Sequence, residues 1–378
     1  MTGPITIQNR KISIVDLGSH YQTIKDEVEK VVLEVLASGH YVLGKNVLEF
    51  ENELANYLKC KHVISCANGT DAISLALMAL DIKPDDEIIT VSHSFFATSE
   101  AIALVGAKPV FVDIREDDFN IDPSKIESLI NKKTKAILPV HLYGQGCEIS
   151  SVIEIAKRHG LYVIEDTAQA LGAQFQGKYL GTFGDIGTIS FFPTKNLGAF
   201  GDGGAICTNN DVFAEKLKQL RVHGSSKRYI HEYIGLNSRL DEIQAAILRV
   251  GLKYLDKWNS QREAAAKYYN ELLKDIELII LPAVKPNCRH VFHQYTIRTK
   301  RRDYLYEKLR EKGIETIIYY PVPIHLQKAF KYLKYKEGSL PITEKLCNEI
   351  LSLPMYPEIK KEIQEYIAEN IKLIFKKQ

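Results

Sequence analysis

The stretch "SFFPTKNLGAFGDGGAI", Ser190 to Ile206, places one lysine, Lys195, between an apolar segment and a glycine-rich one. Two phenylalanines and a proline precede this lysine, and four glycines follow it within nine residues. Lysine usually lies in solvated turns, but neighbours this apolar suit such a turn poorly. Apolar surroundings disfavour the ammonium form, and the neutral amine is a nucleophile toward carbonyl groups. Lys195 is therefore a candidate catalytic residue.

Apolar segments alternate with amphipathic ones along the first 250 residues. In 46–59, the apolar residues Val47, Phe50, Leu54 and Leu58 recur at three- and four-residue steps, which predicts a helix. Two further helices are expected within 70–81 and 150–160. Buried strands are expected within 87–96, 109–114, 135–144, 161–166, 186–192 and 203–208. This alternation predicts an α/β fold with a mainly parallel central sheet flanked by helices.

The pattern changes near residue 250. A long, charged amphipathic stretch, "LKYLDKWNSQREAAAKYYNELLKD", precedes a shorter mixture of strand-like and helix-like segments. We therefore predict a large domain over 1–250 and a smaller C-terminal α+β domain over 251–378.

Composition excludes several classes of protein. The chain has 49 basic and 47 acidic residues and a net charge of +2, so it lacks the charge excess typical of proteins that bind nucleic acid or anionic membranes. No apolar run approaches the thickness of a bilayer. The six cysteines are scattered, without the spacing of a metal site, which favours reduced thiols in a cytoplasmic protein.

Two short phosphate-binding patterns are incomplete. "GHYVLGKN", Gly39 to Asn46, matches the P-loop except at its last position, where Asn46 replaces the serine or threonine that ligates magnesium. No hydrophobic strand leads into Gly39 either. In "GAFGDGGAI" the third glycine of a dinucleotide-binding fingerprint is misplaced. We therefore expect neither site.

The segment "SCANGTDAISLAL" is a better candidate for binding a phosphate. A turn of small residues that includes Thr70 opens directly into a predicted helix. The free amides and the dipole of that helix end, together with the Thr70 hydroxyl, would suit a phosphate. A simple helix cap formed by Thr70 or Asp71 would explain the same residues. The sequence leaves both interpretations open.

A carboxylate follows another expected strand, in "LYVIEDTAQA". Asp166 lies at the carboxyl end of this strand, the edge at which open α/β sheets bind ligands. Burying a carboxylate costs several kcal/mol unless a cation or hydrogen-bond donor accompanies it. A structural ion pair, or an N-cap for a helix in "TAQALGA", would satisfy the same requirement.

One ligand would explain Thr70, Asp166 and Lys195 together. Pyridoxal phosphate (PLP) requires a lysine for its Schiff base, an acid opposite its ring nitrogen and a site for its phosphate. The three residues are one of each kind.

The chain resembles the DegT-type sugar-nucleotide aminotransferases, PLP enzymes with the aspartate-aminotransferase fold (fold type I). The resemblance runs over nearly the whole chain, through "GHYVLGKNVLEFE", "CANGTDAISLAL", "HSFFATSEAI", "PVHLYGQ", "EDTAQALGA", the Lys195 stretch, "RVHG", "GLNSRLDEIQAAIL" and "YYPVPIHLQ". It implies a homodimer whose subunits share active sites.

The resemblance also implies roles for individual residues. Lys195 resembles the Schiff-base lysine and Asp166 the partner of the ring nitrogen. Gln169 is similar to the residue that binds the ring hydroxyl oxygen, and Phe95 to the aromatic that stacks on the ring. The residues similar to the phosphate ligands are Gly69, Thr70, Ser190 and, from the neighbouring subunit, Asn237.

The segment "SSKRYIHEYIGLNSRLDE" is most similar to relatives that aminate C3 of a dTDP-3-keto-6-deoxyhexose. Tyr41, Tyr320 and His325 lie in segments that border the sugar-nucleotide pocket of relatives, although such residues can equally be core. The expected reaction takes the amino group from glutamate, releases 2-oxoglutarate and cycles the cofactor through pyridoxamine phosphate.

Three alternatives stay open. The enzyme could aminate C4 of a UDP- or dTDP-linked 4-keto sugar. It could be a PLP-dependent sugar dehydratase, although the relatives that dehydrate replace the lysine with histidine and this chain keeps Lys195. It could also be a ligand sensor without turnover.

Overall fold

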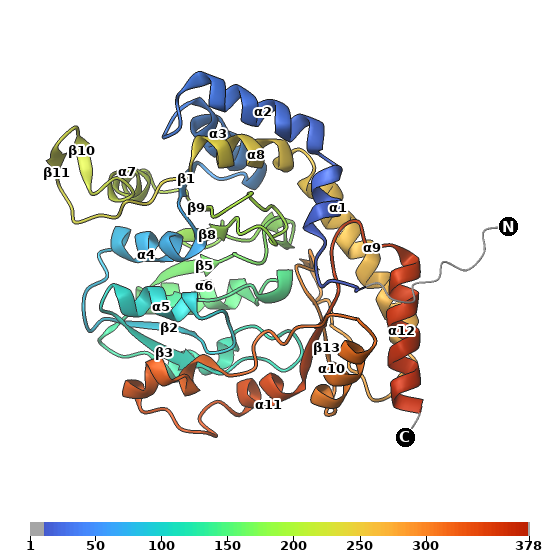
Figure 1. Cartoon of the computed structure of the whole chain (residues 1–378). Helices are drawn as coiled ribbons and strands as arrows, with labels where there is room; N and C mark the ends of the chain where they lie inside the picture. The colour runs from blue at the N-terminus through green and yellow to red at the C-terminus, as the bar shows by residue number, and fades with distance from the viewer. Residues whose placement is uncertain (1–10, 377–378) are drawn as a thin grey trace.

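The computed structural model of the chain describes residues 11–376 (Figure 1). Its centre is a seven-stranded sheet with the strand order β1-β9-β8-β5-β4-β2-β3. The strands are β1 (His62–Cys66), β2 (Glu87–Val91), β3 (Lys108–Val112), β4 (Thr134–Leu138), β5 (Tyr162–Asp166), β8 (Ile186–Ser190) and β9 (Gly204–Thr208). All six predicted strand segments are confirmed, and β1 was missed.

The sheet is parallel except at one strand. β9 runs antiparallel to both of its neighbours, β1 and β8, whereas the other neighbouring pairs are parallel. A parallel neighbour needs a crossover connection, usually a helix. Only the turn 191–203 joins β8 to β9, and this turn lacks a helix, so β9 returns beside β8 in the opposite direction.

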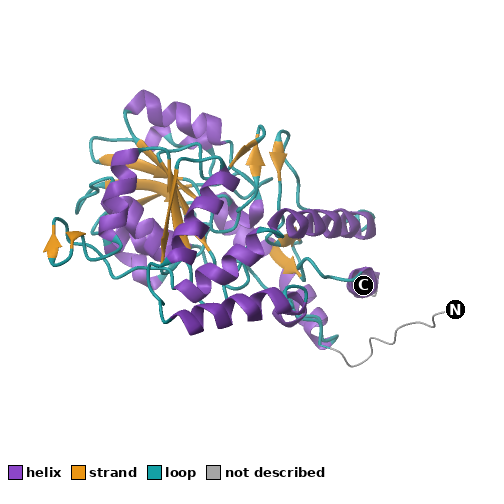
Figure 2. Cartoon of the chain, turned by 90° about the horizontal axis from the view of Figure 1, so that it is seen from above, coloured by secondary structure: helices purple, strands orange, loops and turns teal. Residues whose placement is uncertain are grey.

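Helices lie on both sides of the sheet (Figure 2). Those of the N-terminal two thirds of the chain are α1 (Leu17–Gln22), α2 (Lys25–Ser38), α3 (Lys45–Leu58), α4 (Gly69–Ala79), α5 (Ala97–Leu104), α6 (Ile149–His159), α7 (Asp211–Leu220) and α8 (Glu242–Leu252). The apolar face predicted for 46–59 is buried in α3, with Val47, Phe50, Leu54 and Leu58 at most 2% exposed. α6 ends, as expected, at a left-handed glycine, Gly160 (φ +64°).

Small strands and short 3₁₀ helices complete the chain. The strands are β6 (Gln174–Phe175), β7 (Lys178–Tyr179), β10 (Ser225–Lys227), β11 (Ile230–His231), β12 (Cys288–Arg289), β13 (Tyr295–Arg298) and β14 (Ile350–Leu353). The 3₁₀ helices are η1 (Pro123–Lys125), η2 (Glu127–Leu129), η3 (Leu142–Gly144), η4 (Ile324–Leu326) and η5 (Lys328–Leu333).

The C-terminal part has its own apolar core. It contains α9 (Leu255–Leu273), α10 (Arg302–Glu311), α11 (Pro341–Glu349), α12 (Lys361–Lys376) and the antiparallel pair β13–β14. Ile12 pairs with Ile314 and is buried in this C-terminal core, so the beginning of the described chain packs with its end. The domain limits at 250 and 251 stay a prediction, and residues 1–10 and 377–378 of the two expected domains lie outside the described residues.

No helix between residues 11 and 376 combines the length and the apolar character needed to cross a membrane.

Candidate active site

A tight turn between β8 and β9 holds Lys195. The Lys195 amide donates to the Phe192 carbonyl (2.8 Å), and the Ala199 amide donates to the Phe191 carbonyl (2.7 Å). A Cβ on Gly198 would lie 2.3 Å from the Pro193 carbonyl oxygen, so only glycine fits this position. The glycine-rich sequence thus lets the chain fold back on itself beside Lys195.

The amine of Lys195 is partly buried, and this changes its acidity. Burial lowers the pKa of Lys195 to about 8, while the negative charge of Asp166 acts in the opposite direction. About a tenth of the amine is therefore neutral at pH 7. An exposed lysine would be almost entirely protonated at that pH, so Lys195 is poised to react as a nucleophile.

We expect the Lys195 amine of the cofactor-free protein to react with formaldehyde and a borohydride with a midpoint near pH 8 instead of its ordinary 10.5. Peptide mass spectrometry would follow the rate at each pH. Asp166→Asn should move the midpoint lower still, because it removes the charge that favours the ammonium form. Lys308, whose pKa is raised by its bond to Glu311, is an internal reference. A midpoint at or above pH 10 for Lys195 would contradict the prediction.

Asp166 ends β5 and is only 4% exposed. Its Oδ1 accepts a bond from the Ala168 amide (3.0 Å), and its Oδ2 accepts one from the Thr98 hydroxyl (2.9 Å). Residues 167–173 form turns, so the alternative of a helix cap for "TAQALGA" is wrong. Burial raises the pKa of Asp166. The positive charge of Lys195 acts to lower this pKa, although the two side chains form no ion pair. Asp166 is thus a buried carboxylate that a cationic group would complement.

An aromatic side chain and an amide lie at the same edge of the sheet as this carboxylate. Phe95 lies beyond the end of β2 and is 57% exposed, so it is not strand core. Its ring centroid is 5.9 Å from that of Tyr320. Gln169 accepts a bond from the Tyr143 amide (2.8 Å) and donates one to the Tyr320 hydroxyl (3.2 Å). Phe95 therefore offers an open ring face next to an oriented amide.

The N-terminus of α4 faces the end of β8. A Cβ on Gly69 would lie 2.7 Å from the Cβ of Ser190, so the two residues are in close contact. The cap of this helix is Asn68, which accepts a bond from the Asp71 amide (2.8 Å); the alternative of a Thr70 or Asp71 cap is wrong. The first amides of α4 lack intrahelical acceptors and, with Thr70 and Ser190, form a cradle suited to an anion.

Replacing Gly69 with alanine should weaken PLP binding. The new Cβ would push α4 away from Ser190 and open the cradle. Losing one bond to a charged phosphate raises the Kd by about tenfold or more. Absorbance titration of the cofactor-free protein would measure the change. Gly18→Ala is the matched control, since a Cβ there meets nothing closer than 3.5 Å; an equal effect in both variants would contradict the prediction.

These features together fit PLP. The turn supplies an amine of lowered pKa, and α4 offers an anion cradle next to the turn. β5 supplies a buried carboxylate that forms no ion pair with any residue between 11 and 376. The exposed face of Phe95 would cover a flat ring. Each feature alone has a structural explanation, but their meeting at one edge of the sheet is what this cofactor requires.

Comparison with protein families decides the class. Residues 22–372 match the model of the DegT/DnrJ/EryC1/StrS aminotransferase family. The chain belongs to this family. It is therefore a PLP-dependent aminotransferase of fold type I, and the fold, the enzyme class and the cofactor expected from the sequence are confirmed.

Similar DegT-family proteins cover nearly the full length. A pleiotropic regulatory protein of Geobacillus stearothermophilus is 51% identical over 95% of this chain and 97% of its own. A UDP-N-acetyl-3-dehydro-alpha-D-glucosamine 3-aminotransferase of Acidithiobacillus ferrooxidans is 44% identical (97% and 98% covered). A dTDP-3-amino-3,4,6-trideoxy-alpha-D-glucose transaminase of Streptomyces venezuelae is 42% identical (93% and 93%). The crystal structure of S. venezuelae DesV in complex with a ketimine intermediate superposes with a TM-score of 0.95, at 41% identity and coverage of 97% and 98%.

The near-match to a P-loop has a structural role in this aminotransferase. The Glu242 carboxylate accepts bonds from the backbone amides of Gly44, Asn46 and Val47 at 2.8–2.9 Å. It thereby occupies the N-terminus of α3, where a P-loop would hold phosphate. The segment therefore serves here as the capped start of α3.

The structure does not bring three predicted residues to the Lys195 group. Tyr41 is 49% exposed and bonds the Leu36 carbonyl. Asn237 is exposed and forms a bridge with Val222. His325 is 2% exposed, and its ring nitrogens bond Ser92 (2.8 Å) and Glu344 (3.1 Å).

His325 therefore has no free nitrogen for a substrate in this structure. Its ring instead holds Ser92, three residues before Phe95, against the C-terminal segment. We do not propose direct substrate contact for it.

Sequence reasoning missed two residues of the site. Thr98 bonds Asp166, although 68 positions separate them. Tyr143 orients Gln169 through its amide and bonds the Tyr319 carbonyl through its hydroxyl. Both lie in motifs of the family resemblance, "HSFFATSEAI" and "PVHLYGQ", but nothing in those letters indicates which side chain they contact.

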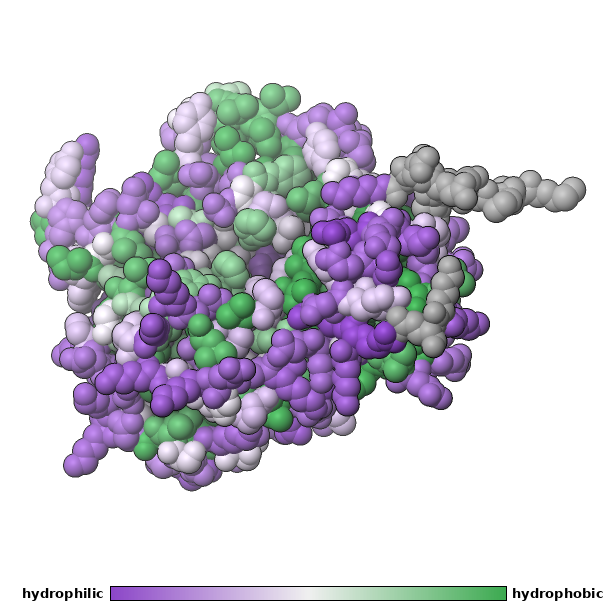
Figure 3. Space-filling view, turned by 60° about the horizontal axis from the view of Figure 1, so that its bottom comes forward, coloured by the Kyte–Doolittle hydropathy of each residue, from purple (hydrophilic) through white to green (hydrophobic). Residues whose placement is uncertain are grey.

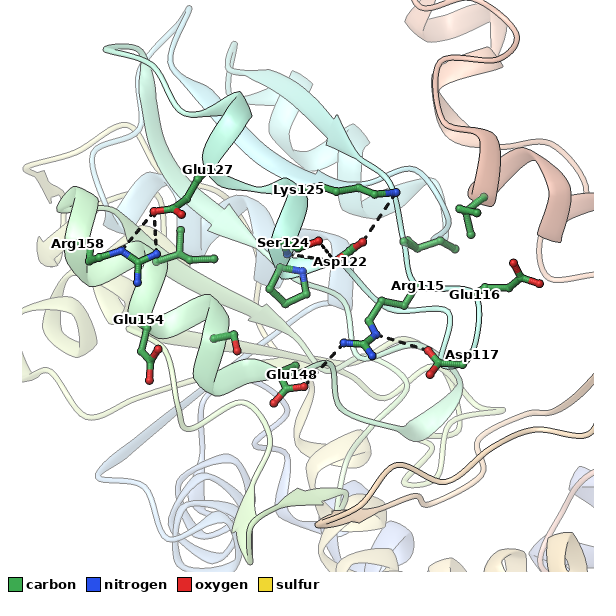
Figure 4. A pocket seen from close by; sticks show the side chains of 15 residues that line it. Arg115, Glu116, Asp117, Asp122, Ser124, Lys125, Glu127, Glu148, Glu154 and Arg158 are labelled. Atoms are coloured by element: carbon green, nitrogen blue, oxygen red, sulfur yellow. Dashed lines mark hydrogen bonds and ion pairs between the residues drawn. The ribbon is translucent and has the colours of Figure 1, made fainter.

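A further groove lies away from the Lys195 group (Figure 4). It has a volume of about 830 Å³, and none of the predicted site residues lines it. Its cations Arg115, Lys125 and Arg158 are paired with carboxylates of the same groove or of neighbouring residues. A groove whose cations are already paired offers little for an anionic ligand to recognise.

Proposed function

We propose that this enzyme transfers the amino group of glutamate to C3 of a dTDP-linked 3-keto-6-deoxyhexose. The observation that carries the reaction type is the meeting of Lys195, Asp166 and the α4 cradle at one edge of the sheet. The names of the Acidithiobacillus and Streptomyces relatives both place an amino group at C3 of a nucleotide-linked sugar.

Each residue of the site has a separate role in the proposed reaction. When bound, PLP supplies a ring that accepts the electron pair released at the α-carbon of the amino donor. The Lys195 amine would hold the cofactor and would move the proton of the donor α-carbon. The Asp166 carboxylate would keep a proton on the ring nitrogen, Gln169 would bind the ring hydroxyl oxygen and Phe95 would stack on the ring. Gly69, Thr70 and Ser190 would bind the phosphate.

The relatives' names favour C3 over C4 but divide on the nucleotide, since one names UDP and the other dTDP. The likeness of "SSKRYIHEYIGLNSRLDE" to dTDP-sugar enzymes favours dTDP. Tyr320 is the best-placed candidate substrate residue, because its hydroxyl bonds Gln169 and its ring lies beside the exposed Phe95. Tyr41 remains a weaker candidate on an exposed loop.

A substrate screen tests this proposal. The purified enzyme would be incubated with PLP, 2-oxoglutarate and one of four nucleotide sugars, namely a 3-amino and a 4-amino sugar, each linked to dTDP and to UDP. Glutamate formation would be measured for each. The dTDP-linked 3-amino-6-deoxy sugar should give the highest kcat/KM. A higher value for a UDP sugar would overturn the choice of nucleotide, and a higher value for a 4-amino sugar would overturn the choice of C3.

The name of the Geobacillus relative raises the question of a regulatory role. Release of 2-oxoglutarate from glutamate answers it, because a transaminase forms one equivalent per site without any sugar. A sugar dehydratase or a sensor should release none. We expect one equivalent, since Lys195, the family's amine, is in place beside Asp166.

We also propose that the enzyme is a homodimer that shares its active sites. A mainly apolar groove of about 540 Å³ lies between α1, α2 and the Lys195 turn, lined in part by Tyr21, Val28, Pro193 and Phe200. Exposed apolar side chains on these elements and on α3 include Leu33, Leu36, Leu48 and Phe192. Hydrophobic side chains also gather at the upper edge of the space-filling view (Figure 3). Contiguous apolar surface of this kind marks protein interfaces.

Mixing two inactive variants should restore activity if the sites are shared. Lys195→Ala removes the amine, and Asn237→Asp places a negative charge where the partner's phosphate is expected. In a 1:1 mixture, half of the dimers are mixed and each has one intact site, so up to about a quarter of wild-type activity should return. Each variant alone is the control. No recovery in a mixture shown to exchange subunits would contradict sharing through Asn237.

A further inference from the structure

A line of hydroxyl groups leads to the Asp166 carboxylate from the side away from Lys195's turn. The Thr98 hydroxyl lies 2.9 Å from Asp166 Oδ2, and the Ser94 hydroxyl lies 2.8 Å from that of Thr98. Ser94 and Thr98 are 3% and 1% exposed. Water therefore does not replace any bond of this line, and each hydroxyl must find its partner within the protein.

The protons of the line have a defined direction. An ionised carboxylate only accepts hydrogen bonds, and a hydroxyl has one proton to donate. Thr98 therefore gives its proton to Asp166 and accepts the proton of Ser94. Donors aligned in this order favour the charged form of the carboxylate, because they lose their partner when it is protonated.

The geometry differs from the usual behaviour of threonine in a helix. Thr98 is the second residue of α5, and a helical threonine commonly bonds a backbone carbonyl one turn earlier. Here the hydroxyl crosses to β5 instead. The Thr98 amide bonds the Phe95 carbonyl (3.2 Å), so the same turn holds the exposed ring and the contact to Asp166.

We propose that Ser94 and Thr98 are positioning residues that keep Asp166 charged and aimed at the PLP ring nitrogen. The inference rests on the cofactor of the family and is independent of the proposed sugar. It joins two features that the cofactor needs, the stacking ring and the buried charge, through one short turn of the chain. Without the line, burial alone would favour the neutral acid, which cannot stabilise a positive ring.

Other titratable groups also face Asp166. Lys195 interacts electrostatically with the Asp166 carboxylate from the β8–β9 turn. His141 does so from the segment after β4, and Tyr320 from the C-terminal segment. None of them changes when Thr98 is replaced. A difference between variants therefore isolates the hydroxyl, even though these groups and the cofactor phosphate contribute to every pH profile.

The test is the Kd of PLP as a function of pH, measured on the full-length protein by absorbance titration. Binding should weaken as Asp166 becomes protonated. The acid limb is the part of the profile at low pH where PLP affinity falls. Thr98→Val removes the hydroxyl at nearly constant volume. In this variant the acid limb should move about one pH unit or more toward higher pH, because the charged form of Asp166 has lost a hydrogen bond. Ser94→Ala should move it less, and Thr98→Ser should restore the wild-type position.

Thr90→Val is the matched control. Thr90 is equally buried on β2, but its hydroxyl bonds the Leu138 carbonyl (2.8 Å) and not the site. The proposal is overturned if the acid limb of Thr98→Val stays at the wild-type pH, or if Thr90→Val shifts it as far. A uniform loss of affinity at all pH values would also overturn it, since that outcome indicates a packing role only. Failure of the sugar screen would leave this test unaffected.

Discussion

Lys195→Ala is expected to lower the rate of amino-group transfer by at least about 10⁴-fold. A positioned acid–base group contributes about 10²–10⁴-fold, and on our proposal the same amine also forms the covalent link to the cofactor. The loss should appear in the first half-reaction, as the absence of 2-oxoglutarate from glutamate in stopped-flow and end-point assays. PLP should still bind through the α4 cradle, but it should be removable by dialysis, because no bond to the protein holds it.

The fold should survive this substitution. Burial already disfavours the Lys195 ammonium, so removing it should not destabilise the protein greatly. Circular dichroism and the melting temperature of the cofactor-free variant would verify this. Lys308→Ala, an exposed lysine of α10 that bonds only Glu311 in the described chain, is the control and should retain full activity. Retention of more than about 1% activity by Lys195→Ala would mean that another group moves the proton.

Asp166→Ala is expected to reduce kcat/KM by about 10²- to 10⁴-fold. Removing one partner of a buried charge pair costs about 3–5 kcal/mol, and each 1.36 kcal/mol is a factor of ten. On our proposal the partner here is the protonated ring nitrogen, which the negative charge of Asp166 would stabilise. Steady-state kinetics with glutamate and the sugar found in the screen would measure the effect.

Asp166→Asn separates charge from shape. Asparagine keeps the volume but has no charge, and its single carbonyl oxygen can accept only one of the two bonds that Ala168 and Thr98 donate to different oxygens of Asp166. Its activity should therefore be as low as that of the alanine variant. Asp166→Glu keeps the charge and should recover part of the activity. If Asp166→Asn retained more than a tenth of wild-type kcat/KM, the partner of the ring nitrogen would have to be another residue.

The helices, strands and reacting groups were predictable because their signals are local. The apolar spacing in 46–59 predicted the buried face of α3, and Gly160 marked the end of α6. An apolar strand followed by Asp166, and a lysine between phenylalanines and glycines, are unusual over short windows. These windows indicated PLP before any contact was known.

The contacts around those groups were not predictable in the same way. Asn68, not Thr70 or Asp71, caps α4, and Glu242 closes the N-terminus of α3 from 196 positions away in the sequence. His325 lies in a motif that borders substrate in relatives, yet it bonds Ser92 and Glu344. Cap geometry and side-chain direction depend on the residues that pack against each position. These neighbours cannot be inferred from the type of the residue itself.

The sequence by itself indicated the reacting groups of this protein, an amine and an acid on a mainly parallel sheet, and left the turn at Thr70 open between an anion site and a helix cap. Residue types and short spacings define these, since they express local propensity and intrinsic reactivity. The tertiary structure alone decided the burial of these groups and their contacts with other residues. It buried Lys195 enough to lower its pKa to about 8, and it placed Thr98 of α5 on Asp166 of β5. Both effects arise from desolvation and from contacts between distant segments, which exist only once the chain is packed.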